Sequence, residues 1–335
     1  MDRRRGHRRG HQGLNGRSAD SPNLHDGSSA RFTPVQVLAL PRTVTVGLDG
    51  SPESLAAAER AAREAELRGL ALRLVHTWDW QPYAQPVPDD AAHRHGGVRV
   101  LREATERLHD RHPDLEITSE QVPQPPVTAL LAAADDVDPL VIGSRGLSSV
   151  TGFLVGSVGL GLVAQTERPA VFVRSGARAE DEHQPDADGR PSAAMPFRDV
   201  VLGPYHKHPD NADIAFGASA RQAARLRVVH GASLPPYFAY GLAADPALGG
   251  ELVRQEESAV EAVLAPWREK FPGVEVVEQA AGRNAGGHLV DAAADTSLVV
   301  VGRRIRRTPL GPRIRPVTHA VLHLATAPVA VVPHH

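Results

Sequence analysis

The stretch GSRGLSSVTGFLVGS, residues 143–157, contains three glycines and a serine whose spacing could serve chemistry. Gly143 and Gly146 open it, and Gly156 and Ser157 close it, with the spacing G-x2-G-x9-G-S. Glycine lets backbone N–H groups approach a ligand without a Cβ clash, and a helix N-terminus concentrates free N–H groups and partial positive charge. The Ser157 hydroxyl adds a donor. The spacing predicts phosphate binding through the backbone; glycines that only form turns are the alternative.

Lysine and cysteine usage narrows the chemistry of this site. The only lysines are Lys207 and Lys270, both in the C-terminal half. A P-loop lysine is therefore unavailable in the N-terminal half, as is Schiff-base chemistry. The absence of cysteine excludes disulfides, thiolate zinc sites and cysteine nucleophiles. No nucleophile elbow of the G-x-S-x-G type is present, and we predict no catalytic residue.

The composition is that of a soluble globular protein. The 335 residues are 41% hydrophobic and 23% charged, with a net charge of -2, which argues against bulk electrostatic binding to nucleic acid. No apolar run approaches the roughly 18 residues of a membrane span. Residues 1–41 begin with an Arg-, Gly- and Ser-rich stretch and predict a disordered tail; an arm for nucleic acid or an acidic partner is the alternative.

Strand and helix patterns alternate through residues 42–174. The turn Asp49-Gly50 follows the first strand, and Ser51 and Pro52 are suited to begin a helix that Gly69 ends. Such alternation predicts a parallel sheet with helices on both faces. The expected strands lie near 43–48, 71–77, 114–120, 138–143 and 169–174, and the expected helices near 52–68, 90–111, 125–135 and 157–166.

A similar order recurs downstream, so the chain is predicted to contain two copies of one unit. LRLVH at 72–76 matches LRVVH at 226–230, and PLVIGSRG at 139–146 matches SLVVVGRR at 297–304. We expect one α/β domain at 42–174 and a second at 197–335, each with a five-stranded parallel sheet. The polar segment 175–196, rich in Pro, Gly and Asp, is expected to be a linker.

Ligands of such sheets bind beyond the carboxyl ends of the strands. Asp49, Thr77 and Gly143 follow or end three of the predicted strands in the first unit. The glycine stretch should therefore face Asp49 across one crevice. This arrangement predicts a nucleotide site.

The chain resembles the universal stress proteins in their tandem two-domain form. The resemblance rests on TVGLDGS at 45–51, on GSRGLSSVTGFLVGS at 143–157 and on the doubled unit. It covers the first unit well and the second more weakly. It implies two Rossmann-like domains of the adenine nucleotide alpha hydrolase type. It also implies ATP as ligand, with or without Mg²⁺, and a cytoplasmic regulatory role in stress. A homodimer, or pairing of the two domains within one chain, is expected.

The resemblance also implies roles for individual residues. Asp49 would contact adenine or ribose, Gly47 and Leu48 would line the same wall, and Thr77 would meet adenine through its backbone. Within the glycine stretch, the implied nucleotide-binding residues are Gly143, Ser144, Gly146, Gly156, Ser157 and Val158. Of these, Gly143 and Gly146 would hold ribose and phosphates, and the last three would hold the phosphate tail.

The second copy of the motif has changed. Gly302 keeps the first glycine, but Ile305 replaces the second, and Arg315-Pro316 replaces the Gly-Ser pair. The counterpart of Asp49 is Gly203 or Tyr205, depending on the alignment, and neither is an acid. We therefore expect one ATP per chain, bound in the first domain. The arginines of residues 302–316 indicate a solvated basic loop or an altered anion or partner site.

Other residues suggest weaker alternatives. His76 and His230 end equivalent strands and are expected to be structural. His206 with His208, and His319 with His323, lack a third ligand at suitable spacing, so no metal site is predicted. The segment 77–83, TWDWQPY, either covers the pocket or the edge of the core. Two other functions stay open: an adenine-nucleotide hydrolase, disfavoured because DGSPES stands where a Ser-Gly-Gly loop is expected, and a nucleotide-free scaffold.

Overall fold

The structure is a computed structural model that describes residues 42–77, 90–134, 139–146, 153–154, 156–203, 210–230, 246–280, 285–305 and 314–334. The predicted tail at 1–41 and the segment that follows Thr77 lie outside these residues, so the predictions made for them stay predictions.

Strands and helices alternate in the N-terminal half as predicted, except that one further short strand, Phe153–Leu154, follows the fourth strand before the last helix. The third strand begins later than expected because residues 113–114 form a turn, and the fourth continues beyond Gly143. The elements are β1 Thr43–Leu48, α1 Pro52–Arg68, β2 Ala71–Thr77, α2 Asp90–Arg111, β3 Ile117–Val122, α3 Pro126–Ala134, β4 Leu140–Gly146, β5 Phe153–Leu154, α4 Ser157–Gln165 and β6 Ala170–Arg174.

The C-terminal half repeats this order. Its elements are β7 Asp199–Gly203, α5 Asp210–Gln222, β8 Leu226–His230, α7 Pro246–Lys270, β9 Val276–Ala280, α8 Ala285–Ala292, the 3-10 turn η2 Ala293–Asp295, β10 Thr296–Arg304, α9 Pro316–Leu324 and β11 Val329–His334. Between the halves lies the 3-10 turn η1 Ala179–Glu182.

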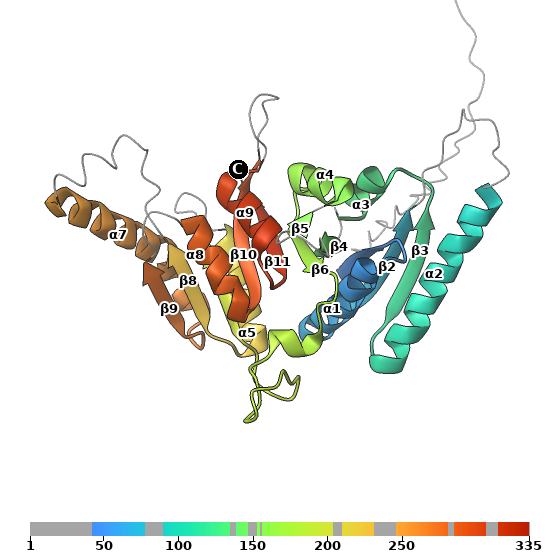
Figure 1. The fold of residues 1–335 in the computed structure, drawn as a ribbon, viewed down its shortest axis with the longest axis horizontal. Coiled ribbons are helices and arrows are strands. Elements are labelled where there is room, and N and C mark those ends of the chain that lie inside the picture. The colour runs from blue at the N-terminus through green and yellow to red at the C-terminus, as the bar shows by residue number, and fades with distance from the viewer. Residues whose placement is uncertain are drawn as a thin grey trace, which may run out of the picture. The chain divides into compact units, whose positions relative to one another are not determined.

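The strands of both halves form one sheet (Figure 1). Among the described residues, the order is β3-β2-β1-β4-β6 in the first half and β11-β10-β7-β8-β9 in the second, with parallel neighbours in each. The predicted fold class, two doubly wound α/β halves, is thus confirmed. The halves join where β6 pairs antiparallel with β11, with Val171 opposite Ala330. The two halves therefore pair within one chain.

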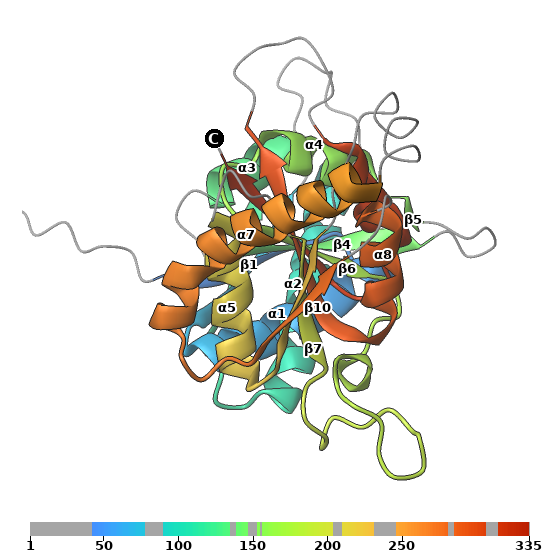
Figure 2. The ribbon, with the colours of Figure 1, turned by 90° about the vertical axis from the view of Figure 1, so that its left-hand side faces the viewer.

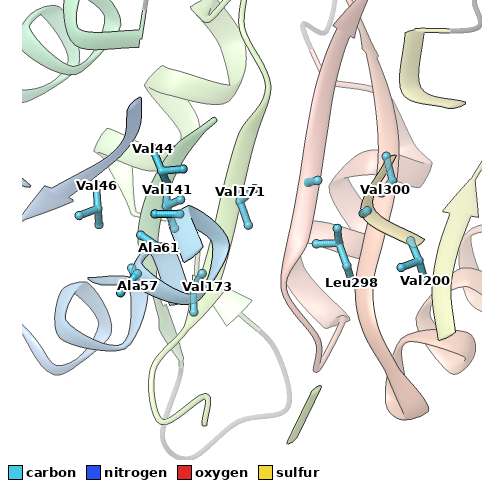
Figure 3. Packing of buried hydrophobic residues seen from close by; sticks show 14 of the residues in the cluster. Val44, Val46, Ala57, Ala61, Val141, Val171, Val173, Val200, Leu298 and Val300 are labelled. Atoms are coloured by element: carbon cyan, nitrogen blue, oxygen red, sulfur yellow. The ribbon is translucent and has the colours of Figure 1, made fainter. Parts of the chain in front are cut away.

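Two apolar cores lie on the two faces of the sheet. One is covered by α1 and α2 in the first half and α5 and α7 in the second; the other is covered by α3, α4, α8 and α9. Figure 2 shows α5 and α8 on opposite sides of the strands. Both cores contain residues from both halves. In the first of them, Val44 and Val171 of the first half share the core with Val200 and Val300 of the second (Figure 3). Strands buried on both faces explain the continuous Val- and Leu-rich runs of the sequence.

Local sequence explains the bounds of α1. The Ser51 hydroxyl accepts a hydrogen bond from the Ser54 N–H at 3.3 Å, and Pro52 occupies the first helical position. Gly69 ends the helix in the left-handed conformation, with φ of 63°, and its N–H donates to the Glu66 carbonyl. Ser51 and Pro52 thus place the N-terminus of α1 directly after β1, and Gly69 sets its C-terminus.

The segment between the halves is packed against both of them. Glu182 is 3% exposed, and its carboxylate oxygens form ion pairs with the guanidinium nitrogens of Arg60 and Arg63 of α1, at 3.0 and 2.5 Å. Arg60 also contacts Glu64 at 2.7 Å, and Glu64 lies 3.5 Å from Arg221 of α5. Buried charges are stable only when they are paired in this way. The segment predicted as a linker therefore carries part of a buried ion-pair cluster.

Candidate functional site

A cavity of about 220 Å³ lies at the carboxyl ends of β1, β2 and β4. Several predicted residues line it: Gly47, Leu48, Asp49, Thr77, Gly143, Gly156, Ser157 and Val158. Others were not predicted: Ser51, Glu53, Ser54, Val75, Pro126, Leu130, Ile142 and Gly159. The glycine motif and the end of the first strand thus meet at one cavity.

The end of β1 is shaped by a local turn. The Asp49 carboxylate accepts hydrogen bonds from the Ser51 N–H at 2.9 Å and from the Ser51 hydroxyl. Its own N–H donates to the Ser54 hydroxyl at 3.4 Å. Asp49 itself is exposed. A carboxylate held at a strand end in this way can accept further hydrogen bonds from a ligand.

Asp49 also affects the electrostatics of β2. Burial lowers the pKa of His76, and the negative charge of Asp49 opposes that shift. A Cβ on Gly97 of α2 would lie only 2.9 Å from His76 Nδ1, so the ring is packed tightly beneath α2. The buried Nδ1 has no hydrogen-bond partner among the described residues, so the structural role expected for His76 stays a prediction.

The N-terminus of α4 forms another wall of the cavity. Gly156 is the N-cap residue, with φ of -58° and ψ of 169°, and its carbonyl accepts from the Leu160 N–H at 2.9 Å. The first N–H groups of a helix have no intrahelical partners. Among the described residues, no atom lies within 4 Å of where a Cβ of Gly156 would be. Neither the backbone angles nor the packing of the described residues therefore requires glycine at this position.

Gly143 is a glycine for a different reason. A Cβ at this position would lie 2.5 Å from the carbonyl carbon and oxygen of Glu53 and 2.7 Å from the Ser54 nitrogen. The strand thus passes directly against the backbone of the first turn of α1, where no side chain fits. Gly47 is also confined, with Ile142 and Leu130 3.1 Å from its Cβ position.

The apolar part of the cavity comes from residues that the motif does not contain. Val75 and Leu130 are buried core residues, and Ile142 is 6% exposed. Val75 and Thr77 share one face of β2 because side chains alternate along a strand. The sequence offers two signals for these apolar lining residues. One is the alternation of side chains along β2, and the other is Pro126, which begins α3 at the same end of the sheet.

The two remaining predicted residues lie further along β4. Ser144 is 3% exposed, and its hydroxyl donates to the Val173 carbonyl at 3.1 Å, so it joins β4 to β6. Gly146 ends β4 and pairs with Phe153 of β5. Residues 147–152, in the middle of the glycine motif, lie outside the described residues.

The equivalent place in the second half is built differently. Helices α4 and α9 have the same length, so Arg315 corresponds to Gly156 as the N-cap and Thr318 corresponds to Gly159. The Thr318 side chain is 3% exposed, and its hydroxyl donates to the Gly302 carbonyl at 2.9 Å. The Thr318 side chain thus occupies the space beside Gly302. In the first half, residue 159 is glycine and has no side chain to fill the equivalent space beside Gly143.

Strand register also settles how the beginnings of the two halves align. Gly203 pairs with Val301 just as Gly47 pairs with Ile142, so Gly203 is the counterpart of Gly47. Counting from it, Tyr205 is the counterpart of Asp49, and it lies outside the described residues. Asn211 of α5 is buried near this strand end and donates to the Gly203 carbonyl at 3.0 Å.

The histidine pairs do not form a recognisable metal centre in the part of the chain that is described. No group of three or more His, Cys, Asp or Glu side chains is clustered there as ligands would be. The rings of His319 and His323 lie 4.1 Å apart, and burial and the neighbouring ring lower the pKa of His319. His206, His208 and Lys207 lie outside the described residues.

The described residues include no helix long and apolar enough to cross a membrane. What they do form is a tandem pair of doubly wound α/β halves, of which the first has an open cavity at the strand ends. Sequence comparison agrees with this class: the model of the universal stress protein family matches residues 41–174 and 207–333. The chain belongs to the universal stress protein family.

Some relatives match most of this chain, and others match about one of its halves. A universal stress protein of Mycobacterium tuberculosis is 29% identical over 303 residues, covering 86% of this chain and 96% of its own. The crystal structure of a universal stress protein from Archaeoglobus fulgidus covers 88% of this chain and 98% of its own, with a TM-score of 0.55 and 14% identity, a likeness of fold alone. A universal stress protein solved in complex with cAMP is 28% identical over 41% of this chain and 98% of its own, with a TM-score of 0.32.

Proposed function

We propose that the first half of this chain binds an adenine nucleotide, ATP with or without Mg²⁺, and that the protein is a regulatory nucleotide-binding protein of the stress response. The adenine would lie against Val75, Leu130 and Ile142. The ribose would lie near Asp49, and the phosphates at the N-terminus of α4.

One observation carries this proposal: Gly156 lines the cavity, and a Cβ on it would meet no atom of the described residues within 4 Å. Glycine is not the best N-cap residue, since Ser, Asp and Asn stabilise helix ends more. The vacant volume beside the free N–H groups of α4 is the kind of place where phosphate oxygens bind.

The charges of the cavity support binding through the backbone and a role for Mg²⁺. Glu53 and Asp49 line it, and among its described lining residues there is no Lys or Arg. Two carboxylates repel a polyphosphate, and Mg²⁺ bound to phosphate oxygens reduces that repulsion. We therefore expect Mg²⁺ to strengthen ATP binding more than AMP binding.

We propose that the second half binds no nucleotide, so that each chain binds one. The support is Thr318 beside Gly302 and Arg315-Pro316 at the N-terminus of α9, where Pro316 lacks an N–H. A calorimetric titration of the full-length protein with ATP should give a stoichiometry near one. A stoichiometry near two would contradict this division between the halves.

The test of the proposal as a whole is to identify what the purified protein carries and binds. Mass analysis of small molecules released on denaturation should find an adenine nucleotide, and titration of the stripped protein with ATP, AMP and cAMP should show saturable binding. No released nucleotide and no binding would contradict the proposal and favour the scaffold alternative. Rapid ATP turnover would favour the hydrolase alternative.

We further propose that the β6–β11 pairing takes the place of a homodimer interface, so that the chain is a monomer in solution. The support is that this pairing already joins the two halves edge to edge. Light scattering would measure the mass; a stable dimer would contradict it. A cytoplasmic location stays a prediction of the family resemblance.

A further inference from the structure

The helix that carries the proposed phosphate end of the site is weak by its own sequence. Helix α4, SVGLGLVAQ, has Gly159 and Gly161 in its interior, and glycine is among the least favourable residues there. It has no acidic residue in its first turn and no basic residue in its last. Its position must therefore depend on contacts made by other elements.

A residue of the second half supplies such a contact. Arg303 of β10 is 3% exposed, and its guanidinium donates to the Ala164 carbonyl at 3.3 Å and to the Thr166 carbonyl. Both carbonyls belong to the C-terminal end of α4, where helix carbonyls lack intrahelical partners. The same end carries the negative part of the helix dipole, which a buried cation stabilises.

The contact is not reciprocal between the halves. The residue of β4 that matches Arg303 is Ser144, whose hydroxyl donates to the Val173 carbonyl instead. Helix α9 has a basic residue of its own, His323, in its last turn. The half that has lost the nucleotide motif thus supports the helix of the half that has kept it.

We propose that Arg303 is a positioning residue for the nucleotide site of the first half, acting through α4. The inference rests on the proposed function. Because α4 has nine residues and is about 14 Å long, a shift at its C-terminus moves the N–H groups of Ser157 and Val158. Strand β5, which lies within the glycine motif, contacts α9, so the second half touches the motif at a second place. The degenerate half therefore sets the geometry of the phosphate end.

The test compares a ligand with phosphate to one without. In the full-length protein, Arg303→Met should weaken AMP binding about threefold to tenfold, where tenfold corresponds to about 1.4 kcal/mol. Adenosine affinity should stay within about twofold, because adenosine does not reach the end of α4. Arg304→Met, at the exposed next position of β10, is the matched control and should change neither. Unchanged AMP affinity, or equal losses for AMP and adenosine, would overturn the inference.

A second measurement needs no ligand. Hydrogen exchange of the α4 amides should be faster in Arg303→Met than in the wild type, while exchange of the α9 amides stays the same. Equal protection of α4 would overturn the inference. If wild-type protein binds no adenine compound, the proposed function fails, and the exchange measurement still decides whether Arg303 holds α4 in place. If Arg303→Met does not fold, Arg303→Gln should lower the AMP-to-adenosine affinity ratio more than Arg303→Lys; equal ratios would count against Arg303.

Discussion

Gly143 and Gly156 belong to one motif but have different physical reasons to lack a side chain. At Gly143 a Cβ would collide with the backbone of Glu53, whereas at Gly156 it would meet no atom of the described part of the chain within 4 Å. The first glycine is needed for the fold and the second for the proposed ligand. A substitution at Gly156 should therefore mainly weaken binding, and a substitution at Gly143 should mainly lower stability.

The first prediction concerns Gly156→Val. The branched side chain would occupy the phosphate position, so ATP affinity should fall at least tenfold, about 1.4 kcal/mol. The ligand-free melting temperature should change by only a few degrees, because the position is open. Calorimetric titration and thermal unfolding would measure both.

Gly143→Ala is the contrasting variant. It should lower the ligand-free melting temperature more than Gly156→Val does, because its methyl group would be forced against a backbone, and overpacking costs about 1–3 kcal/mol. If instead Gly156→Val binds ATP as the wild type does, the phosphates do not lie at this helix end.

The second prediction concerns Asp49→Ala. ATP affinity should decrease, while the ligand-free melting temperature changes by only a few degrees, because the hydrogen bonds that Asp49 accepts from Ser51 are exposed. Such bonds contribute about 0.5–1.5 kcal/mol each. Asp49→Asn keeps the acceptor oxygen for Ser51 and isolates the effect of the charge. A large loss of ligand-free stability in Asp49→Ala would make Asp49 a turn residue.

Helices α4 and α9 show how the same element serves two purposes. They share length, position and C-terminal geometry, since the Thr166 and Ala325 N–H groups donate to the Leu162 and Val321 carbonyls. They differ on the side that faces the strand end, where α9 places Thr318. The two helices differ here in a side chain and not in the backbone. We therefore expect that threonine placed at residue 159 of α4 will reproduce the arrangement of Thr318 in α9.

The third prediction is that Gly159→Thr will give the first half the arrangement of the second. The threonine hydroxyl should donate to the Gly143 carbonyl, as Thr318 does to Gly302, and its side chain should fill the cavity. ATP binding should then fall below detection in calorimetry while the circular dichroism spectrum is unchanged. The reverse change, Thr318→Gly, should not create a second site, because Arg315-Pro316 stays in place; a gain of one ATP per chain would show that Thr318 alone blocks it.

Across the whole molecule, the buried ions around Glu64 and Glu182 hold α1, α5 and the connecting segment together. Burial alone would raise the pKa of Glu64, but the guanidinium groups of Arg60, Arg68 and Arg221 outweigh it and lower the pKa to about 2. Burial alone would lower the pKa of Arg60, but Glu182 and Glu64 raise it above its ordinary value. Both groups are therefore charged at neutral pH.

The fourth prediction follows from the sign of the Glu64 shift. A carboxyl whose pKa is lower in the folded state stabilises the fold above its unfolded pKa, near 4.5, and loses that contribution as the pH falls toward 2. The free energy of unfolding should decrease over this window. Glu64→Gln should reduce that decrease and also lower stability at pH 7, since it leaves buried arginines with fewer partners. Glu103→Gln, on the exposed side of α2, is the control; an identical pH profile in Glu64→Gln and wild type would contradict the prediction.

The sequence by itself determined the α/β class, the two copies and most element positions, because strand and helix periodicity, the Ser51 cap and the Gly69 stop act between residues close in the chain. It also indicated three of the glycines that line the cavity, Gly47, Gly143 and Gly156, but it missed Gly159, and Gly146 is not among the described lining residues. The binding role of these residues and the domain bounds at 42–174 and 197–335 stay predictions. Only the tertiary structure decided that β6 pairs with β11, that both cores run through both halves, and that Arg303 reaches α4. It also separated Gly143 from Gly156. The reason is physical: these contacts join residues far apart in the chain, and what surrounds a side chain there depends on strand order and register, which no local pattern specifies.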